Sequence, residues 1–406
     1  MHSANKNIKK IDSGFCAVAI QTACLILLIL FYSSTIAQNI KNEKVVLQLK
    51  WKNQFQFAGY YAALEKGYYK EVGLNVEIRE ANESTSATNE VLNGDAQYGI
   101  ANSELVMYYM EGKPLVVLAC IMQNSPSALL VRSSSNIFSP KDLAGKSIEI
   151  DKDKSGIDIF TMLSKEGINV NQINIKSVTF SLNNLLANKI DALAVYTTNE
   201  PFFLDKFGIP YRLIYPRDYG INFYSECLFT SKEEVDDHPD RVRNFRTASI
   251  KGWKYALENP EEIINIIQSK YQSIKTAEYL LRESEQIRKL INPEFIEVGH
   301  SNKERWLNIV EILSQQGFIN HYKDIDEFLY NPYESKEPIS NLVLEIIVAG
   351  LAIGLALLTY YIIKLRKSLS AKNTEFDKLT NQSELQKIEL KRLKSEVKRL
   401  NDIVNS

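Results

Sequence analysis

The sequence lacks most of what metal, redox and nucleic-acid chemistry requires. Its four cysteines include no pair at C-x-x-C spacing, and its four histidines lie far apart along the chain. A net charge of −1 over 406 residues gives no overall attraction to nucleic acid. No Ser/His/Asp or Cys/His set presents itself as a catalytic group. We therefore expect no metal, no cofactor, no catalytic residue and no nucleic-acid partner.

The few cysteines fall into two pairs by their surroundings. Cys16 and Cys24 lie in an apolar N-terminal stretch. Cys120 and Cys227 lie in apolar segments of the main part of the chain, where we expect them to be buried as small apolar side chains. A disulfide between them is the alternative.

What the sequence does have is two long apolar runs, of which the first resembles an export signal. Three lysines precede the apolar stretch 15–31, and small residues follow, with Ala37 at the −1 position of a cleavage site. We predict that residues 1–37 form a signal peptide that is cleaved after Ala37. An uncleaved N-terminal anchor is the alternative, because the apolar core is long for a signal.

The second apolar run, 342–363, is long enough to cross a membrane. A helix of 22 residues spans about 30 Å of hydrocarbon. Lys364, Arg366 and Lys367 follow directly, so the positive-inside rule places the C-terminus in the cytoplasm. The prediction is a single-pass protein of the inner membrane whose preceding domain lies in the periplasm.

Residues 366–405 show a heptad pattern. Apolar side chains such as Leu369, Phe376 and Leu390 occupy most positions of one seam, and the intervening positions are charged or polar. This pattern favours a parallel coiled coil and therefore a homodimer. A single charged helix next to the membrane is the alternative.

The region 42–338 alternates strand and helix patterns in two series. The first runs from a strand at 45–49 to a strand at 98–101, and the second from 147–150 to 192–196. Apolar strands at 115–132 and 222–230 link the series, and helices are expected at 238–258, 261–271, 276–290 and 302–316. We predict an α/β protein with two lobes that close by a hinge, the plan of a periplasmic binding protein. The first lobe comprises about 42–131 and 226–338, and the second about 132–225.

Loops at the carboxyl ends of the first lobe's parallel strands supply the first candidate ligand contacts. Trp51, Phe57 and Tyr60 offer aromatic faces, and one of two glutamines offers an amide, with Gln54 preferred to Gln56. The other candidates, directly after the strand at 98–101, are Asn102 and Ser103. For Trp51 the alternative is that the side chain only caps the core. For Asn102 and Ser103 the alternative is that they serve only as a helix cap.

The second lobe offers a second set of contacts. Ser155 and Gly156 lie between a strand and a helix, where a carbonyl or an anion can bind, although such pairs are common at ordinary helix starts. Tyr196, Asn199 and Glu200 follow the strand at 192–196. The Glu200 carboxylate is the preferred single contact, because it can accept from an amino group; a surface helix cap is its alternative. Near the second link between the lobes, Asn222 and Tyr224 complete the predicted site.

Several segments together resemble a known family. They are LQLKWKNQFQFAGYYAALEKGYYKEVGLNVEI, YGIANSEL, LAGKSIEI, TTNEPFFL, the long stretch from YGINFYSECLFT to KYALENPEE, and IEVGHSNKERW. They are similar to the family that groups thiamine-precursor binding proteins with the thiamine pyrimidine synthase of yeast. The resemblance implies a type II periplasmic-binding fold and a small heterocyclic ligand, such as a formylaminopyrimidine. It is strongest to the bacterial branch that serves as the extracytoplasmic sensor domain of histidine kinases and diguanylate cyclases.

Three functions follow from these patterns. A sensor would pass ligand closure through the membrane helix and the coiled coil to a separate kinase or cyclase. The first alternative is the binding component of an ABC transporter with a permease partner. The second is a synthase, but the positions where the resemblance requires a cofactor-binding lysine and a histidine hold Ala101 and Leu105, and the cysteine-rich position, 220–224, holds no cysteine.

Overall fold

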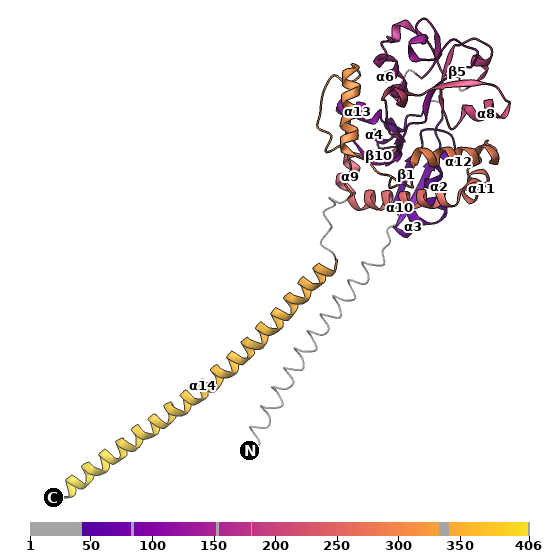
Figure 1. Cartoon of the computed structure of the whole chain (residues 1–406). Coiled ribbons are helices and arrows are strands. Elements are labelled where there is room, and N and C mark those ends of the chain that lie inside the picture. The colour runs from indigo at the N-terminus through magenta and orange to yellow at the C-terminus, as the bar shows by residue number, and fades with distance from the viewer. Residues whose placement is uncertain (1–42, 83–84, 152–153, 180, 333–340, 405–406) are drawn as a thin grey trace. The chain divides into compact units, whose positions relative to one another are not determined.

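A computed structural model describes residues 43–82, 85–151, 154–179, 181–332 and 341–404 (Figure 1). The chain divides into a compact unit within residues 40–335 and a unit that contains the long C-terminal helix α14 (Asn341–Val404). The predicted signal peptide at 1–37 lies outside the described residues.

The compact unit is built on two five-stranded sheets. The first has the order β2-β1-β3-β10-β4, with β1 (Glu43–Gln48), β2 (Leu74–Arg79), β3 (Tyr98–Ala101), β4 (Leu115–Met122) and β10 (Ser225–Ser231). The second has the order β7-β6-β8-β5-β9, with β5 (Ser127–Arg132), β6 (Ser147–Glu149), β7 (Asn174–Lys176), β8 (Ala192–Tyr196) and β9 (Tyr211–Ile214). Figure 1 shows β1 and β10 in one part of the unit and β5 in the other.

The two sheets have the same internal plan. In the first, β1 is parallel to β2 and β3, and β10 is antiparallel to β3 and β4. In the second, β6 is parallel to β7 and β8, and β5 is antiparallel to β8 and β9. The chain passes from the first sheet to the second between β4 and β5 and returns between β9 and β10. The predicted two-lobed α/β fold is confirmed.

Helices cover both sheets. The α-helices of the compact unit are α2 (Ala58–Glu65), α3 (Tyr68–Glu71), α4 (Ala87–Leu92), α5 (Leu105–Met110), α6 (Ile157–Lys165), α7 (Asn183–Leu186), α8 (Glu200–Lys206), α9 (Lys232–Asp237), α10 (Pro239–Glu258), α11 (Pro260–Lys270), α12 (Ala277–Ile291) and α13 (Lys303–Gln315). The 3-10 turns are η1 (Phe55–Phe57), η2 (Pro140–Leu143), η3 (Lys154–Gly156), η4 (Val170–Gln172) and η5 (Pro216–Tyr219).

The sequence pattern at 58–72 predicts one helix, but the structure has two, α2 and α3. Gly67 adopts a left-handed backbone with φ of 78°, which ends α2 and begins α3 in a new direction. The short strand β9 was not predicted from the sequence. Its four residues lie between Pro210 and Pro216 and are too few to show a period.

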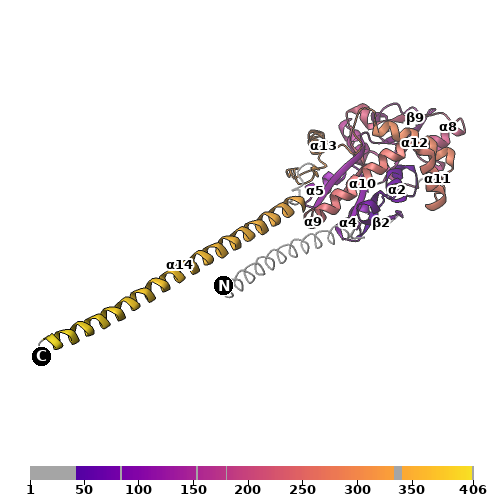
Figure 2. The same ribbon diagram turned by 90° about the horizontal axis from the view of Figure 1, so that it is seen from below.

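Close contact between α2 and α10 joins the helices that cover the first sheet (Figure 2). A Cβ atom on Gly252 would lie 2.1 Å from the carbonyl oxygen of Gly59, and one on Gly59 would lie 2.1 Å from the ring of Trp253. Only glycine at both positions permits this approach. Trp253 is fully buried there, edge-on to Tyr60 with 5.8 Å between ring centroids.

Cys120 on β4 and Cys227 on β10 are fully buried within the apolar core, and the structure shows no bond between them.

Helix α14 is 64 residues long. An 18-residue window in its stretch from Ile346 has a mean hydropathy of 2.4, so the helix is long and apolar enough to cross a membrane. In the C-terminal part of the helix, side chains of the heptad seam such as Leu369, Phe376 and Leu390 are exposed on the single chain. Membrane insertion and the coiled coil remain predictions.

Candidate functional site

A cavity of about 310 Å³ lies where the carboxyl ends of the parallel strands of both sheets face each other. From the first lobe it is lined by residues after β1 and β3, among them Lys50, Trp51, Gln56, Asn102 and Glu104. From the second lobe it is lined by residues after β6 and β8, among them Asp151, Ser155, Gly156, Tyr196, Asn199 and Glu200. This volume is suited to a small molecule of one or two rings.

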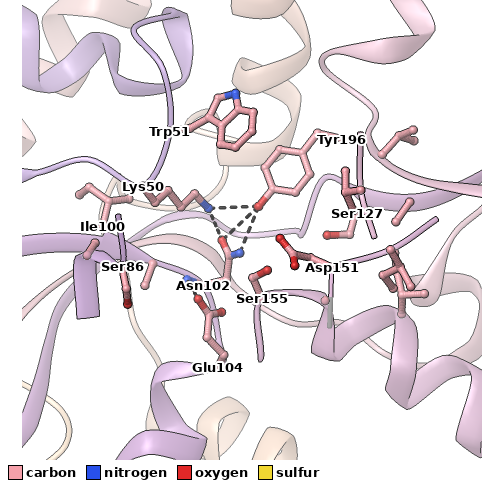
Figure 3. A pocket seen from close by; sticks show the side chains of 18 of the residues that line it. Lys50, Trp51, Ser86, Ile100, Asn102, Glu104, Ser127, Asp151, Ser155 and Tyr196 are labelled. Carbon is pink, nitrogen blue, oxygen red and sulfur yellow. Dashed lines mark hydrogen bonds between the residues drawn. The ribbon is translucent and has the colours of Figure 1, made fainter. Parts of the chain in front are cut away.

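Lys50 is the central charged group of the cavity (Figure 3). Its Nζ lies 2.6 Å from Oε1 of Glu226 and also donates to Oδ1 of Asn102 and, at 3.1 Å, to the hydroxyl of Tyr196. Glu226 is fully buried, and its Oε1 also accepts from Nε2 of Gln56 at 2.7 Å. All three protons of the ammonium therefore have an acceptor.

The pKa values of this pair follow from burial and mutual attraction. Burial alone would lower the pKa of Lys50, but the adjacent charge of Glu226 raises it above its ordinary value. Burial raises the pKa of Glu226, and the charge of Lys50 opposes that rise. Lys50 is thus a protonated ammonium held by a buried carboxylate.

Glu226 also has an uncommon backbone conformation, with φ of +53°. A left-handed backbone at a residue other than glycine costs on the order of 1 kcal/mol or more and persists only where its surroundings hold it. Here the side chain is held by Lys50 and Gln56, so the strained residue lies beside the cavity.

Tyr196 connects the lobes across the cavity. Its hydroxyl, at the end of β8, accepts from Lys50 and, at 3.1 Å, from Nδ2 of Asn102 in the first lobe. Asn102 is itself positioned by Oγ of Ser225, which donates to its Oδ1 at 2.7 Å. The indole of Trp51 lies near the Tyr196 ring in Figure 3, so this side of the cavity offers aromatic surface.

Glu200 begins α8 with its carboxylate turned back toward β8. Its Oε2 accepts from the backbone N–H of Tyr196 at 3.1 Å, and burial raises its pKa to about 7. Glu283 on α12 is fully buried, accepts from the N–H of Phe55 at 2.8 Å, and has its pKa raised by burial to about 8.

These raised pKa values predict that stability falls as the pH rises from about 4.5 to about 8. In this range the folded chain retains protons on Glu283 and Glu200 that the unfolded chain has released. For Glu283 the slope of the free energy of unfolding approaches about 1.4 kcal/mol per pH unit. Urea unfolding at pH 5, 6.5 and 8 measures this slope, and Glu283→Gln should reduce it. A free energy of unfolding that rises over this range would contradict the assignment.

The structure brings seven of the predicted contacts together around the cavity: Trp51, Asn102, Ser155, Gly156, Tyr196, Asn199 and Glu200. They come from four strand ends in two lobes, which is the arrangement expected from parallel strands.

The structure reverses the predicted preference for Gln54 over Gln56. Gln56 lines the cavity, whereas Gln54 is buried behind it and donates to Oε1 of Gln56 at 2.5 Å. The two side chains differ in placement because Phe55–Phe57 forms the 3-10 turn η1, whereas an extended loop would place residues two positions apart on the same face.

The structure corrects the placement of Phe57 and Tyr60. Both are fully buried in the apolar core of the first lobe instead of lining the cavity. Tyr60 lies on α2 and packs against Trp253. Their apolar rings are used to attach the helix to its neighbours.

Ser103, Asn222 and Tyr224 also lie away from the lining. Ser103 is buried and donates to the backbone carbonyl of Tyr224 at 2.9 Å, and the Tyr224 ring packs on Trp306 with 5.3 Å between centroids. Asn222 accepts from Arg305 at 3.0 Å. These residues fasten the second link between the lobes to the first lobe and its helix α13.

Lys50 and Glu226 were not among the contacts predicted from the sequence. A signal for Glu226 was present, because its carboxylate is the single charged group of the strand that Cys227 and Leu228 continue. A buried charge in such a strand requires a partner. The identity of that partner, 176 positions earlier in the chain, depends on the pairing of distant strands.

Comparison with known proteins identifies the family. The family described as NMT1/THI5 like matches residues 54–263, just over half of the chain. The chain belongs to this family. The resemblance inferred from the sequence motifs is thereby confirmed.

Curated relatives of this NMT1/THI5 like chain have different named roles. It is 23% identical to a formylaminopyrimidine-binding protein of Halalkalibacterium halodurans, over 78% of this chain and 97% of that protein. It is 22% identical to the riboflavin-binding protein RibY of Chloroflexus aurantiacus, over 72% and 86%. It is 21% identical to a 4-amino-5-hydroxymethyl-2-methylpyrimidine phosphate synthase of Legionella pneumophila, over 75% and 97%.

Solved structures establish the fold. The alkanesulfonate-binding protein SsuA of Xanthomonas axonopodis superposes with a TM-score of 0.55 at 11% identity, covering 71% of this chain and 99% of that one. This NMT1/THI5 like chain therefore has the fold of periplasmic binding proteins.

Proposed function

We propose that the chain is a membrane-anchored extracytoplasmic binding protein for a small flat heterocycle such as a thiamine pyrimidine precursor. The observation that carries the proposal is the interlobe cavity, where the Trp51 and Tyr196 side chains provide aromatic surface and amide, hydroxyl and carboxylate groups surround it. A pyrimidine needs such faces for stacking and fixed polar partners for its edge. The formylaminopyrimidine-binding relative supports the same ligand class.

Two lining groups are suited to the edge of an aminopyrimidine. The Tyr196 hydroxyl already accepts two hydrogen bonds, and its own proton has a long contact of 3.4 Å to Oδ1 of Asn102. A ring nitrogen placed closer would accept that proton. An oxygen of the Glu200 carboxyl group can accept from the exocyclic amine whether the group is protonated or ionised. Burying such an edge without partners costs about 1–3 kcal/mol per group.

The proposed output is signalling. Ligand binding stabilises the closed arrangement of the two lobes, and the change is passed to α14. In this proposal the apolar part of α14 crosses the inner membrane, its C-terminal part pairs with a second copy in the cytoplasm, and a separate kinase or cyclase receives the signal. The apolar window from Ile346 and the exposed heptad seam support it.

The lysine in the cavity does not favour the synthase alternative. A lysine forms a Schiff base only as the neutral amine. Lys50 is held as an ammonium by Glu226, with a raised pKa. Ala101, at the position where the resemblance requires the cofactor lysine, also lines the cavity and has no amine.

Thermal unfolding of the detergent-solubilised chain with candidate ligands tests the ligand class. We expect formylaminopyrimidine or 4-amino-5-hydroxymethyl-2-methylpyrimidine to stabilise the chain by about 2.7 kcal/mol at a hundredfold excess over Kd. Tyr196→Phe removes the proposed donor and should weaken binding about tenfold. The matched control is Tyr211→Phe, whose hydroxyl contacts Asp205 on the surface of the same lobe.

A thermal shift with riboflavin and with neither pyrimidine would exclude a thiamine pyrimidine precursor as the ligand. The absence of a shift with every heterocycle tested would show that the ligand class is wrong. Equal binding by Tyr196→Phe and wild type would remove the hydroxyl from the site.

A further inference from the structure

The two buried thiols face each other across neighbouring strands. Cys120 on β4 and Cys227 on β10 are direct partners in the antiparallel register, and their Sγ atoms are 3.3 Å apart. Both side chains are fully buried in the same apolar core. The cavity described above does not include either sulfur.

The backbone already places these residues at disulfide distance. Direct partners on antiparallel strands have Cα atoms about 4.5–5.5 Å apart. Disulfide-bonded residues have Cα atoms about 4.4–6.8 Å apart. Closing the gap between the sulfurs therefore requires small rotations of the side chains and no change in strand register.

We propose that Cys120 and Cys227 are joined by a disulfide bond when the chain folds outside the cytoplasm. This rests on the proposed export of the domain, because disulfides persist in oxidising compartments. In the reaction, one cysteine thiolate attacks a protein disulfide oxidant or oxidised glutathione to form a mixed disulfide. The second thiolate then displaces the oxidant's remaining thiol. The two cysteines lose two protons and two electrons, and the oxidant is reduced to two thiols.

Burial sets the time at which the bond forms. In the folded chain neither thiol is exposed to an oxidant, and burial raises the pKa of the Cys227 thiol, which keeps it protonated and unreactive. The bond therefore forms while β10 is pairing with β4, before helices cover the sheet. Once formed, it is protected from reductants by the same burial.

The bond would join the two strands of the first lobe between which the chain makes its excursion into the second lobe. The cysteines are 107 positions apart, and the whole second sheet, β5 to β9, lies between them in the chain. Both links between the lobes, residues 123–126 and 215–224, lie within this loop. A disulfide here ties the ends of the loop on the first lobe and leaves the links free to bend. It therefore stabilises the fold without blocking closure.

Peptide mapping of the full chain tests the bond. The chain is exported, isolated from membranes, denatured with an alkylating reagent and no reductant, and digested. A second sample is refolded from the reduced state in glutathione redox buffer. We expect one disulfide-linked peptide pair that contains Cys120 and Cys227 in both samples. Mapping by peptide separates these cysteines from Cys16 and Cys24, which remain if the signal is not cleaved.

The thermal consequence is measured on the same samples. Reductant added during unfolding should lower the Tm of the oxidised chain by about 10 °C. It should leave the Tm of the Cys120→Ala/Cys227→Ala chain unchanged. Alkylation of both cysteines in either unreduced sample would overturn the proposal. Ligand binding in the thermal shift experiment does not involve these sulfurs, so failure of the disulfide and failure of the ligand assignment give separate results.

Discussion

Replacement of Lys50 by methionine is expected to lower the free energy of unfolding by about 3–5 kcal/mol. Methionine has a similar length and fits the apolar part of the site, but it leaves the carboxylate of Glu226 buried without a countercharge. The side chain of Glu226 is only 1% exposed, so water cannot replace the ammonium. Urea unfolding followed by circular dichroism at pH 7 measures the loss.

Two further variants show whether the loss comes from the unpaired charge. The Lys50→Met/Glu226→Gln double variant should regain much of the stability, because it removes both charges. The matched control is Lys52→Met, two positions away on the exposed surface, which should change stability by less than about 0.5 kcal/mol. If Lys50→Met were no worse than this control, the carboxylate would not be ionised in the folded chain, and the proposed charge pair would be wrong.

The second large effect is expected for Gly252→Ala on α10. A Cβ atom at this position would lie 2.1 Å from the backbone oxygen of Gly59 and 2.7 Å from Cβ of Ala63. The nearest atom belongs to the backbone and cannot rotate away as a side chain could. The helices α2 and α10 must therefore separate, and Trp253 loses its packing against them. The expected loss is about 3 kcal/mol or more. The measurement is the urea midpoint of the purified chain or, if the variant does not accumulate, its yield.

The control for this prediction is an alanine at an exposed position of the same helix. Thr247→Ala on α10 should raise stability by a few tenths of a kcal/mol, because alanine has a higher helix propensity than threonine. Glycine is less favourable than alanine in a helix by about 1 kcal/mol, so helix propensity favours both substitutions. A Gly252→Ala chain as stable as the wild type would show that the two helices are not in close contact.

Much of the fold could be predicted because the elements are local patterns. The strands at Tyr98–Ala101 and Ala192–Tyr196 are read directly from short apolar runs, and α10 from its long amphipathic period. The elements that were missed or misjoined, β9 and the α2–α3 pair, depend on four residues between prolines and on one left-handed glycine.

The candidate site could be predicted only in part, for a physical reason. Strand order in a parallel sheet brings strand ends together, so Asn102 and Tyr196 could be placed at one cleft from sequence pattern alone. Whether an aromatic ring after a strand faces ligand or core depends on which helix packs against it. Tyr60 is buried because α10 approaches α2 closely at Gly59, and Gln56 replaces Gln54 at the cavity because η1 turns the chain.

By itself the sequence determined the two α/β series, the family, and an apolar C-terminal helix long enough for a membrane, because each depends on neighbouring residues or on short motifs. Only the tertiary structure decided that Lys50 is neutralised by Glu226 and that Cys120 faces Cys227. Both pairs join residues more than 100 positions apart, and both depend on β10 returning from the second lobe to pair with β3 and β4. Local pattern carries no information about such pairing, because the contacts form only when the chain has crossed between the lobes twice.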